Sequence, residues 1–269
     1  MKREGSPRTC SGEDVTLRPP AGPVERRLAE RVGAGPIHMT LIDPDRSGPE
    51  RAAEIAREAV GLGSDAIMLG GSTGISRERM DAVARAVRAA VEAPTIIFPE
   101  GPGSLSSSAH AIFFMSLLNS RNLDLVIRTH ARTALAVQAL GIEPIAMGYL
   151  VIAPGMRVGE VGEADAVARD DLAGAQGYAL AAEYLGMRWI YLEAGSGAPA
   201  PVPAPMVRAV RSILSVPLIV GGGIRSGTDA RALLEAGAQA LVTGTITETD
   251  GVSREFREIL AEVGRARGR

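Results

Sequence analysis

From residue 37 onward, short runs of apolar and β-branched residues alternate with segments rich in Ala, Arg and Glu that carry helical spacing. A turn signal built from Gly, Pro, Asp or Ser separates each apolar run from the helical segment after it. The apolar runs predict strands at 37–42, 66–69, 95–98, 111–118, 145–152, 189–193, 218–220 and 240–243. Helices are predicted at 49–62, 76–91, 124–140, 172–185, 203–214, 227–236 and 254–266.

Regular alternation of strand and helix predicts a parallel sheet, and eight strands favour an α/β fold of the (β/α)8 TIM-barrel type. Residues 99–110, between the third and fourth strands, form a Gly/Ser-rich loop with room for at most one helical turn. We therefore expect a modified barrel that lacks the helix between strands 3 and 4. A doubly wound open sheet is the structural alternative. No predicted strand is followed by GxGxxG with an acidic residue about 20 positions on, which argues against a dinucleotide fold and NAD.

Residues 1–35 lack apolar periodicity until a short stretch near Leu28. This pattern predicts a flexible N-terminal tail, followed by one barrel domain over residues 36–269. The tail has no signal-peptide core, and no apolar run reaches the length of about 18 residues that crosses a bilayer. We expect a cytoplasmic protein with at most peripheral membrane contact.

Composition removes several function classes. The 269 residues are 46% apolar and 22% charged, and the net charge of −2 provides no basic field for nucleic acid. Cys10 is the only cysteine, and the three histidines lack zinc-ligand spacing. Lys2 is the only lysine, so the folded domain has no amine for Schiff-base or pyridoxal phosphate chemistry.

Glycines follow the last two predicted strands, in the strings GGGIRSG from Gly221 and VTGT from Val242. Glycine lets backbone N–H groups approach an anion, and a helix N-terminus behind it adds a favourable dipole. In barrels these two strands commonly build a phosphate site. The alternative is that both strings are only tight turns.

Carboxylates and hydroxyls follow three other strands, where barrels place their catalytic groups. Tyr191 and Glu193 project to one face at the end of the sixth strand, so Glu193 is either a general base in the barrel mouth or a solvated loop residue. Asp43 and Ser72 follow the first and second strands and offer an oxygen-only set that suits Mg²⁺. The Asp-Pro-Asp string at Asp43 is also a common turn.

Two further segments suggest a substrate channel. The apolar run 111–118 is a buried strand by pattern, although the missing helix would leave a groove beside it for a hydrophobic substrate. Residues 154–170, around Arg157, form a long Gly-rich loop that is a candidate lid.

Read in order, these segments resemble the geranylgeranylglyceryl phosphate synthase family. The resemblance rests on the strings HMTLIDPD, DAIMLGGSTG, FFMSLLNSRN, MGYLVIAPG, YALAAEYLGMRWIYLEAGSGAP, VPLIVGGGIRSG and ALVTGTITE. Of these, YLEAGSGAP together with GGGIRSG is specific. The resemblance implies an Mg²⁺-dependent prenyltransferase of ether-lipid synthesis, which joins sn-glycerol 1-phosphate to geranylgeranyl diphosphate and releases diphosphate.

The resemblance also implies roles for individual residues. Glu193 would be the base, with Tyr191 beside it in the catalytic site, and Asp43 and Ser72 would hold the metal. Glycerol phosphate would be bound by Tyr191, Leu192, Glu193, Ala194, Gly195, Ser196, Gly197, Gly222, Gly223, Gly244 and Thr245.

The chain departs from the family pattern at Glu100, His110 and Ala153, all expected on the side that meets the prenyl chain or its diphosphate. Prenyl length is therefore open. A phosphosugar isomerase or related biosynthetic barrel, with Asp43 and Glu193 as its acid and base pair, is one alternative function. A non-catalytic phosphoglycerol- or lipid-binding barrel is another. We expect at least a homodimer, because barrels of this kind often associate.

Overall fold

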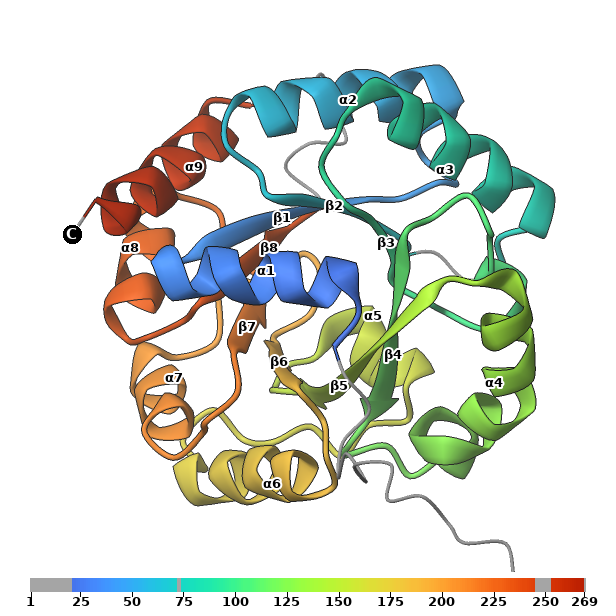
Figure 1. Cartoon of the computed structure of the whole chain (residues 1–269). Coiled ribbons are helices and arrows are strands. Elements are labelled where there is room, and N and C mark those ends of the chain that lie inside the picture. The colour runs from blue at the N-terminus through green and yellow to red at the C-terminus, as the bar shows by residue number, and fades with distance from the viewer. Residues whose placement is uncertain (1–20, 72–73, 245–252, 269) are drawn as a thin grey trace, which may run out of the picture.

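The computed structural model, which describes residues 21–71, 74–244 and 253–268, is a closed barrel (Figure 1). Neighbouring strands are parallel and follow chain order, and β8 closes the barrel by pairing with β1. The strands are β1 Ile37–Ile42, β2 Ala66–Leu69, β3 Thr95–Ile97, β4 Ala111–Leu117, β5 Glu143–Val151, β6 Trp189–Glu193, β7 Leu218–Gly221 and β8 Ala240–Thr243. The predicted TIM barrel is confirmed.

Helices surround the barrel at α2 Pro49–Gly61, α3 Arg77–Ala90, α4 Thr129–Leu140, α6 Leu172–Tyr184, α7 Ala204–Arg211, α8 Gly227–Glu235 and α9 Arg254–Arg267 (Figure 1). A π-helical turn, η2 Asp124–Arg128, leads directly into α4. Between β3 and β4 the chain forms only the 3₁₀ turn η1 Pro102–Ser104, so the predicted gap in the helical layer is present. None of the helices within the described ranges has the length and apolar character needed to cross a membrane.

Side chains of each strand alternate between the barrel interior and the helical layer. In β6, Trp189 and Tyr191 belong to the interior cluster with Met39 of β1, whereas Ile190 packs outward with alanines of α6 and apolar residues of α7. This alternation follows from the two-residue period of a strand. The same period carries Glu193 to the interior at the end of β6.

A helix closes the N-terminal end of the barrel, where we had predicted a flexible tail through residue 35. Helix α1, Pro23–Ala34, lies across this end in Figure 1, with Val24 and Leu28 in the interior cluster. The carboxylate of Glu143 accepts hydrogen bonds from the backbone N–H groups of Val24 (2.7 Å) and Glu25 (2.8 Å). The prediction was wrong over this helix because long-range charge contacts hold it, and its own apolar pattern is short. The remainder of the predicted tail, residues 1–20, lies outside the described residues.

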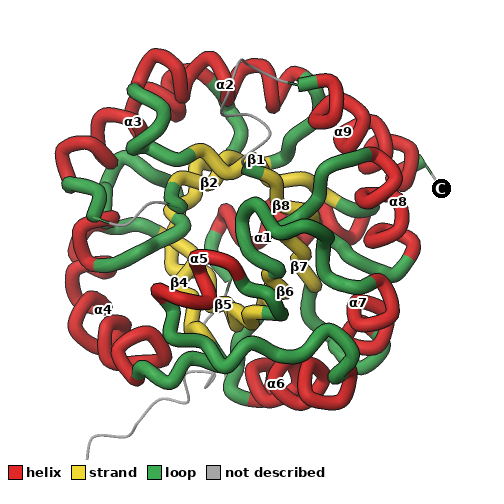
Figure 2. The backbone as a smooth tube through the Cα atoms, turned by 180° about the vertical axis from the view of Figure 1, so that it is seen from behind, coloured by secondary structure: helices red, strands yellow, loops and turns green. Residues whose placement is uncertain are grey.

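The candidate lid after β5 is attached to its surroundings. It contains a short helix, α5 Met156–Val161. Figure 2, which views the barrel from behind, shows this helix at the end opposite α1. The Asn119 amide donates to the carbonyl oxygens of Val151 (2.9 Å) and Asp165 (2.8 Å). The Arg169 guanidinium donates to the carbonyl oxygens of Ala153 (3.2 Å) and Pro201 (2.7 Å). These contacts hold the segment in place beside the mouth of the barrel.

Candidate active site

A cavity of about 520 Å³ opens at the C-terminal ends of the strands. It gathers predicted residues from four separate stretches of sequence, namely Asp43, Tyr191, Glu193, Ser196, Gly197, Gly222, Gly223 and Gly244. This is the end of a barrel where loops after the strands converge. Ser72 and Thr245, also predicted for this site, lie outside the described residues.

Three predicted residues of the β6 end lie beside the cavity and do not line it. The side chains of Leu192 and Ala194 are fully buried in the apolar layer outside the barrel. Gly195 is buried as well, and its backbone N–H donates to Glu193 Oε1 at 2.7 Å. Gly195 therefore supports the carboxylate from behind.

Glycines shape the phosphate end of the cavity. Gly222 and Gly223 have φ of 78° and 69°, a region that side chains with a Cβ rarely adopt. A Cβ at Gly222 would lie 2.2 Å from Glu193 Oε1, so space also requires glycine there. Helix α8 begins directly behind this turn, and the Ser226 side chain caps it by accepting a hydrogen bond from the Asp229 N–H. Backbone amides and a helix N-terminus at one place suit an anion such as phosphate.

Glu193 is a buried carboxylate held by hydroxyl and amide donors. Its side chain accepts hydrogen bonds from the phenols of Tyr191 and Tyr149 as well as from Gly195 N–H. Burial raises the pKa of Glu193 above its ordinary value, and the three hydrogen bonds oppose that rise. In the described part of the chain no arginine or histidine forms an ion pair with it. A carboxylate in this setting is a proton acceptor with a raised pKa, as a general base requires.

Sequence reasoning missed Tyr149. Its phenol is fully buried, and burial together with the Glu193 charge raises the pKa of Tyr149 well above the usual range. Tyr149 of β5 pairs in register with Tyr191 of β6, and their rings lie edge to face with centroids 5.0 Å apart. The two-residue period of β5, combined with barrel register, would have placed Tyr149 beside Tyr191.

An aromatic cluster connects this carboxylate with the neighbouring strands. The ring of Phe98 lies 5.6 Å from that of Tyr149 and 5.9 Å from that of Tyr191, measured between centroids. Phe98 directly precedes Pro99 and Glu100, which line a second hollow described below. The cluster thus lies between the phosphate end of the cavity and that hollow.

Asp43 supplies an oxygen donor at the end of β1. Its side chain is largely buried, accepts a hydrogen bond from Asp45 N–H at 2.9 Å and faces Arg46 Nε at 3.6 Å. No group of three or more His, Cys, Asp or Glu side chains suited to a metal occurs in the described residues. One carboxylate matches the sparse protein ligation of Mg²⁺, which keeps waters and takes substrate phosphates as further ligands.

A groove of about 190 Å³ lies where the helix between β3 and β4 is missing. Its apolar lining includes Leu105, Ile112, Phe114, Met115 and Leu117. Glu100 and His130 add polar groups; His130 Nε2 lies 2.6 Å from the Met115 carbonyl oxygen, and the imidazole ring stands edge-on to Phe114. This groove matches the apolar channel that the sequence suggested for a hydrophobic substrate.

The three departures from the family pattern do not share one location. Glu100 lines the apolar groove, and Ala153 lies after β5 in the segment that Arg169 holds. His110 precedes β4, at the N-terminal end of the barrel, where its Nδ1 accepts a hydrogen bond from Thr95 N–H at 3.1 Å. Placing His110 on the prenyl side was therefore wrong. The predicted strand 111–118 had already placed His110 before its strand, at the end of the barrel away from the cavity.

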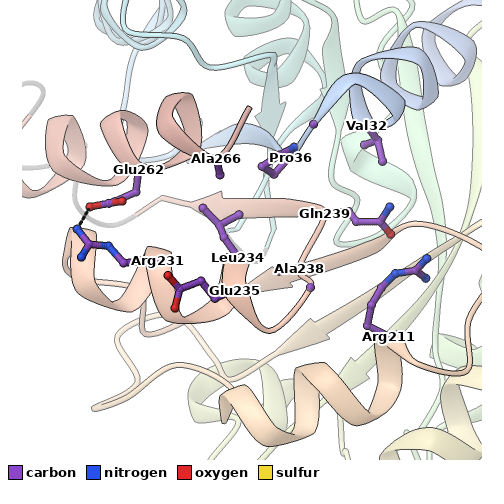
Figure 3. Close-up of a pocket in the computed structure, with 12 residues that line it drawn as sticks. Val32, Pro36, Arg211, Arg231, Leu234, Glu235, Ala238, Gln239, Glu262 and Ala266 are labelled. Atoms are coloured by element: carbon purple, nitrogen blue, oxygen red, sulfur yellow. Dashed lines mark hydrogen bonds and ion pairs between the residues drawn. The ribbon is translucent and has the colours of Figure 1, made fainter. Parts of the chain in front are cut away.

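A separate cavity of about 430 Å³ lies near the opposite end, between α1, α8 and α9 (Figure 3). Its charged side chains are engaged in structural contacts. Arg231 pairs with Glu262, as the dashed line in Figure 3 marks. Arg211 Nη1 donates to the carbonyl oxygens of Leu214 (2.8 Å) and Val216 (3.3 Å). The buried carboxylate of this cavity, Glu262, is compensated by ion pairs with both Arg231 and Arg265, unlike Glu193 in the cavity at the C-terminal end.

Comparison with known proteins agrees with this assignment. Residues 27–263 match the PcrB family. Geranylgeranylglyceryl phosphate synthase of Thermococcus gammatolerans is 49% identical over 242 residues, 90% of this chain and 96% of that protein. The enzyme of the same name from Methanothermobacter thermautotrophicus is 51% identical over 229 residues, 85% of this chain and 93% of that protein.

A solved structure is similar in fold and sequence. (S)-3-O-geranylgeranylglyceryl phosphate synthase from Thermoplasma acidophilum, in complex with its substrate sn-glycerol-1-phosphate, superposes with a TM-score of 0.86. It is 45% identical, and the match covers 88% of this chain and 97% of that one. The resemblance inferred from the strings is confirmed, and the chain belongs to the PcrB family.

Proposed function

We propose that this protein is a geranylgeranylglyceryl phosphate synthase, which joins sn-glycerol 1-phosphate to geranylgeranyl diphosphate in ether-lipid synthesis. The observation that carries the proposal is Glu193, a buried carboxylate between two tyrosines, at the edge of a glycine-lined cavity suited to phosphate. Relatives that share about half of their residues carry this name. The Thermoplasma acidophilum relative binds sn-glycerol-1-phosphate.

The chain's own residues account for the acceptor half of the reaction. The turns after β7 and β8 hold the phosphate of glycerol phosphate, with Ser196 and Gly197 of the β6 loop beside them. The primary hydroxyl then lies toward Glu193. As this oxygen bonds to C1 of the prenyl chain, the bond from C1 to diphosphate breaks and Glu193 accepts the hydroxyl proton. Diphosphate leaves with the electron pair of the broken bond.

The donor half combines the groove with Asp43. The groove beside β4 takes the prenyl chain, and its diphosphate extends toward Asp43 and Arg46 at the β1 end. Asp43, with Ser72 after β2, would hold Mg²⁺, which when bound neutralises charge on the diphosphate. The prenyl length stays open, since Glu100 lines this groove in place of the family's usual residue. The same reaction with another prenyl diphosphate is the nearest alternative.

We also propose that the protein forms at least a dimer. Two helices on the outside of the barrel carry exposed apolar side chains, including Leu135 of α4 (77% exposed) and Tyr184 at the end of α6 (79% exposed). Leu185 follows with 79% of its surface exposed. Adjacent exposed apolar side chains such as Tyr184 and Leu185 favour association. Sedimentation of wild type and of Tyr184→Ser/Leu185→Ser tests this: a wild type with the mass of a monomer would contradict the dimer, and an unchanged mass of the variant would place the interface elsewhere.

The test of function is product formation. Purified protein is incubated with Mg²⁺, radiolabelled sn-glycerol 1-phosphate and a series of prenyl diphosphates, and the lipid product is identified by chain length. We expect an ether product, formed fastest with geranylgeranyl diphosphate. No product at any length would contradict the synthase assignment. Binding of glycerol phosphate without turnover would instead favour a non-catalytic binding barrel. Isomerised phosphosugar would favour the biosynthetic-barrel alternative.

A further inference from the structure

Arg225 connects the two loops that form the phosphate end of the cavity. It lines this cavity from the turn after β7, and its Nη2 donates to the carbonyl oxygen of Gly197, in the loop after β6, at 2.8 Å. Gly197 has φ of 77°, and both Ser196 and Gly197 are exposed. An exposed turn of this kind depends on contacts from outside it to keep one conformation.

The backbone of Arg225 is itself fixed by the start of α8. Its N–H donates to Asp229 Oδ2 at 3.0 Å. The same carboxylate accepts from Ser226 Oγ at 2.9 Å, while Asp229 N–H donates back to Ser226 Oγ at 3.1 Å. This reciprocal arrangement is a helix cap that also anchors the residue before it. The guanidinium therefore starts from a rigid position.

The guanidinium of Arg225 engages a neutral carbonyl oxygen. In the described residues its guanidinium forms no ion pair with Asp or Glu, whereas Arg46, the other arginine of the cavity, faces Asp43 at 3.6 Å. The Gly197 carbonyl oxygen carries partial negative charge, which would repel a phosphate dianion nearby. Arg225 engages that oxygen and adds a positive charge at the same place.

We propose that Arg225 is a positioning residue for the acceptor substrate: it holds the β6 loop against the β7 turn and favours the phosphate dianion of glycerol phosphate. The proposal rests on the proposed function, because it assigns the phosphate to this end of the cavity. It predicts that Arg225 acts on binding of the acceptor and leaves the prenyl diphosphate half unaffected. Neither the sequence motifs that resemble the family nor the family match itself assigns a role to the Arg225 side chain.

The experiment compares Arg225→Gln and Arg225→Lys with wild type. We expect Gln to raise KM for sn-glycerol 1-phosphate about tenfold to a hundredfold, as for loss of a charged hydrogen bond. At saturating substrate kcat stays within about twofold of wild type, because the lost interaction stabilises the bound substrate and the transition state equally. KM for the prenyl diphosphate is unchanged. Lysine restores part of the binding because it keeps the charge without the planar fork. Added salt raises KM more in wild type than in Arg225→Gln.

Arg208→Gln serves as the matched control, since Arg208 is an exposed arginine on α7, which follows the same β6 loop. All four proteins should unfold at similar temperatures. A fall in kcat with KM unchanged, or equal rises in KM for both substrates, would overturn the proposal. Calorimetric titration of each protein with sn-glycerol 1-phosphate alone separates the two hypotheses. If wild type binds but forms no ether, the synthase assignment fails, while the affinity difference still tests Arg225.

Discussion

Both ends of the barrel contain buried charged side chains, but the partners of these charges differ between the two ends. At the N-terminal end, Glu25 pairs with Arg188 at 2.6 Å, and Asp65 receives both Arg31 and Arg267. At the C-terminal end, Glu193 is buried among hydroxyl and amide donors without a cationic partner in the described residues. Charges at the first end are compensated by ion pairs, whereas the buried charge of Glu193 at the second end is held by neutral donors.

This difference separates stability from chemistry. A paired charge recovers much of its desolvation cost, so it can hold an element such as α1 in place. A buried carboxylate held only by neutral donors keeps a raised pKa. Such groups are typical of active sites, where a raised pKa serves proton transfer. Perturbed groups can also be structural, so the distinction needs tests at both ends.

The largest expected effect is at Glu193. Glu193→Gln keeps the size and much of the hydrogen bonding but removes the proton acceptor. Turnover should therefore fall by roughly 10²–10⁴, with a modest change in glycerol phosphate binding. Steady-state kinetics and calorimetry with sn-glycerol 1-phosphate measure the two quantities. Near-full turnover would assign the base to another group, and joint loss of binding and turnover would make Glu193 a substrate anchor.

Asp43→Asn tests the carboxylate at the end of β1. It removes the one anionic side chain that we assign to the metal, so prenyl diphosphate affinity in Mg²⁺ should fall about tenfold to a hundredfold. Glycerol phosphate should still bind, because we assign its phosphate to the glycines after β7 and β8, away from Asp43. Calorimetry with a non-reactive prenyl diphosphate analogue, with and without Mg²⁺, provides the measurement. An affinity that is unchanged in Mg²⁺ would show that the assignment of Asp43 is wrong.

The third test breaks a charge pair at the N-terminal end. Glu25→Gln leaves Arg188 without its carboxylate, and we expect the free energy of unfolding to fall by about 1–3 kcal/mol. A fully buried pair would cost more, but Arg188 retains some contact with solvent. Denaturant unfolding measures the loss, with Arg254→Gln in an exposed pair as control. KM and kcat at 25 °C should match wild type. A large change in either would show that the two ends are coupled.

Sequence predicted the barrel well because each strand depends mainly on local pattern. The ranges for β1, β2, β6 and β8 coincide with the predicted runs, and the missing helix between β3 and β4 followed from a Gly/Ser-rich loop. Asp43 and Glu193 could be placed because barrels put strand ends at one mouth. Helix α1 escaped prediction, since Glu143, more than a hundred residues away, caps it. Tyr149 and Arg225 act through partners on other strands and loops, which local pattern cannot show.

The smallest expected effect is that of Tyr149→Phe, which is measured as a shift in the pH profile and reports on the pKa of Glu193. The Tyr149 hydrogen bond favours ionised Glu193 and opposes the rise in pKa caused by burial. Without that donor the pKa of Glu193 rises further, so the base is protonated at a higher pH. The acid limb of kcat/KM should move to higher pH, so that Tyr149→Phe loses activity several-fold on that limb and little on the plateau above it.

This shift distinguishes the hydrogen bond from packing. Titration of the glycerol phosphate itself is the same for both enzymes, so it cancels in their comparison. Phe98→Leu removes a ring that contacts Tyr149 but donates no hydrogen bond, and it should lower activity equally at all pH values without moving the limb. If Tyr149→Phe gave a profile parallel to wild type, Tyr149 would be a packing residue. Tyr191 and the Gly195 amide would then be the donors that set the charge of Glu193.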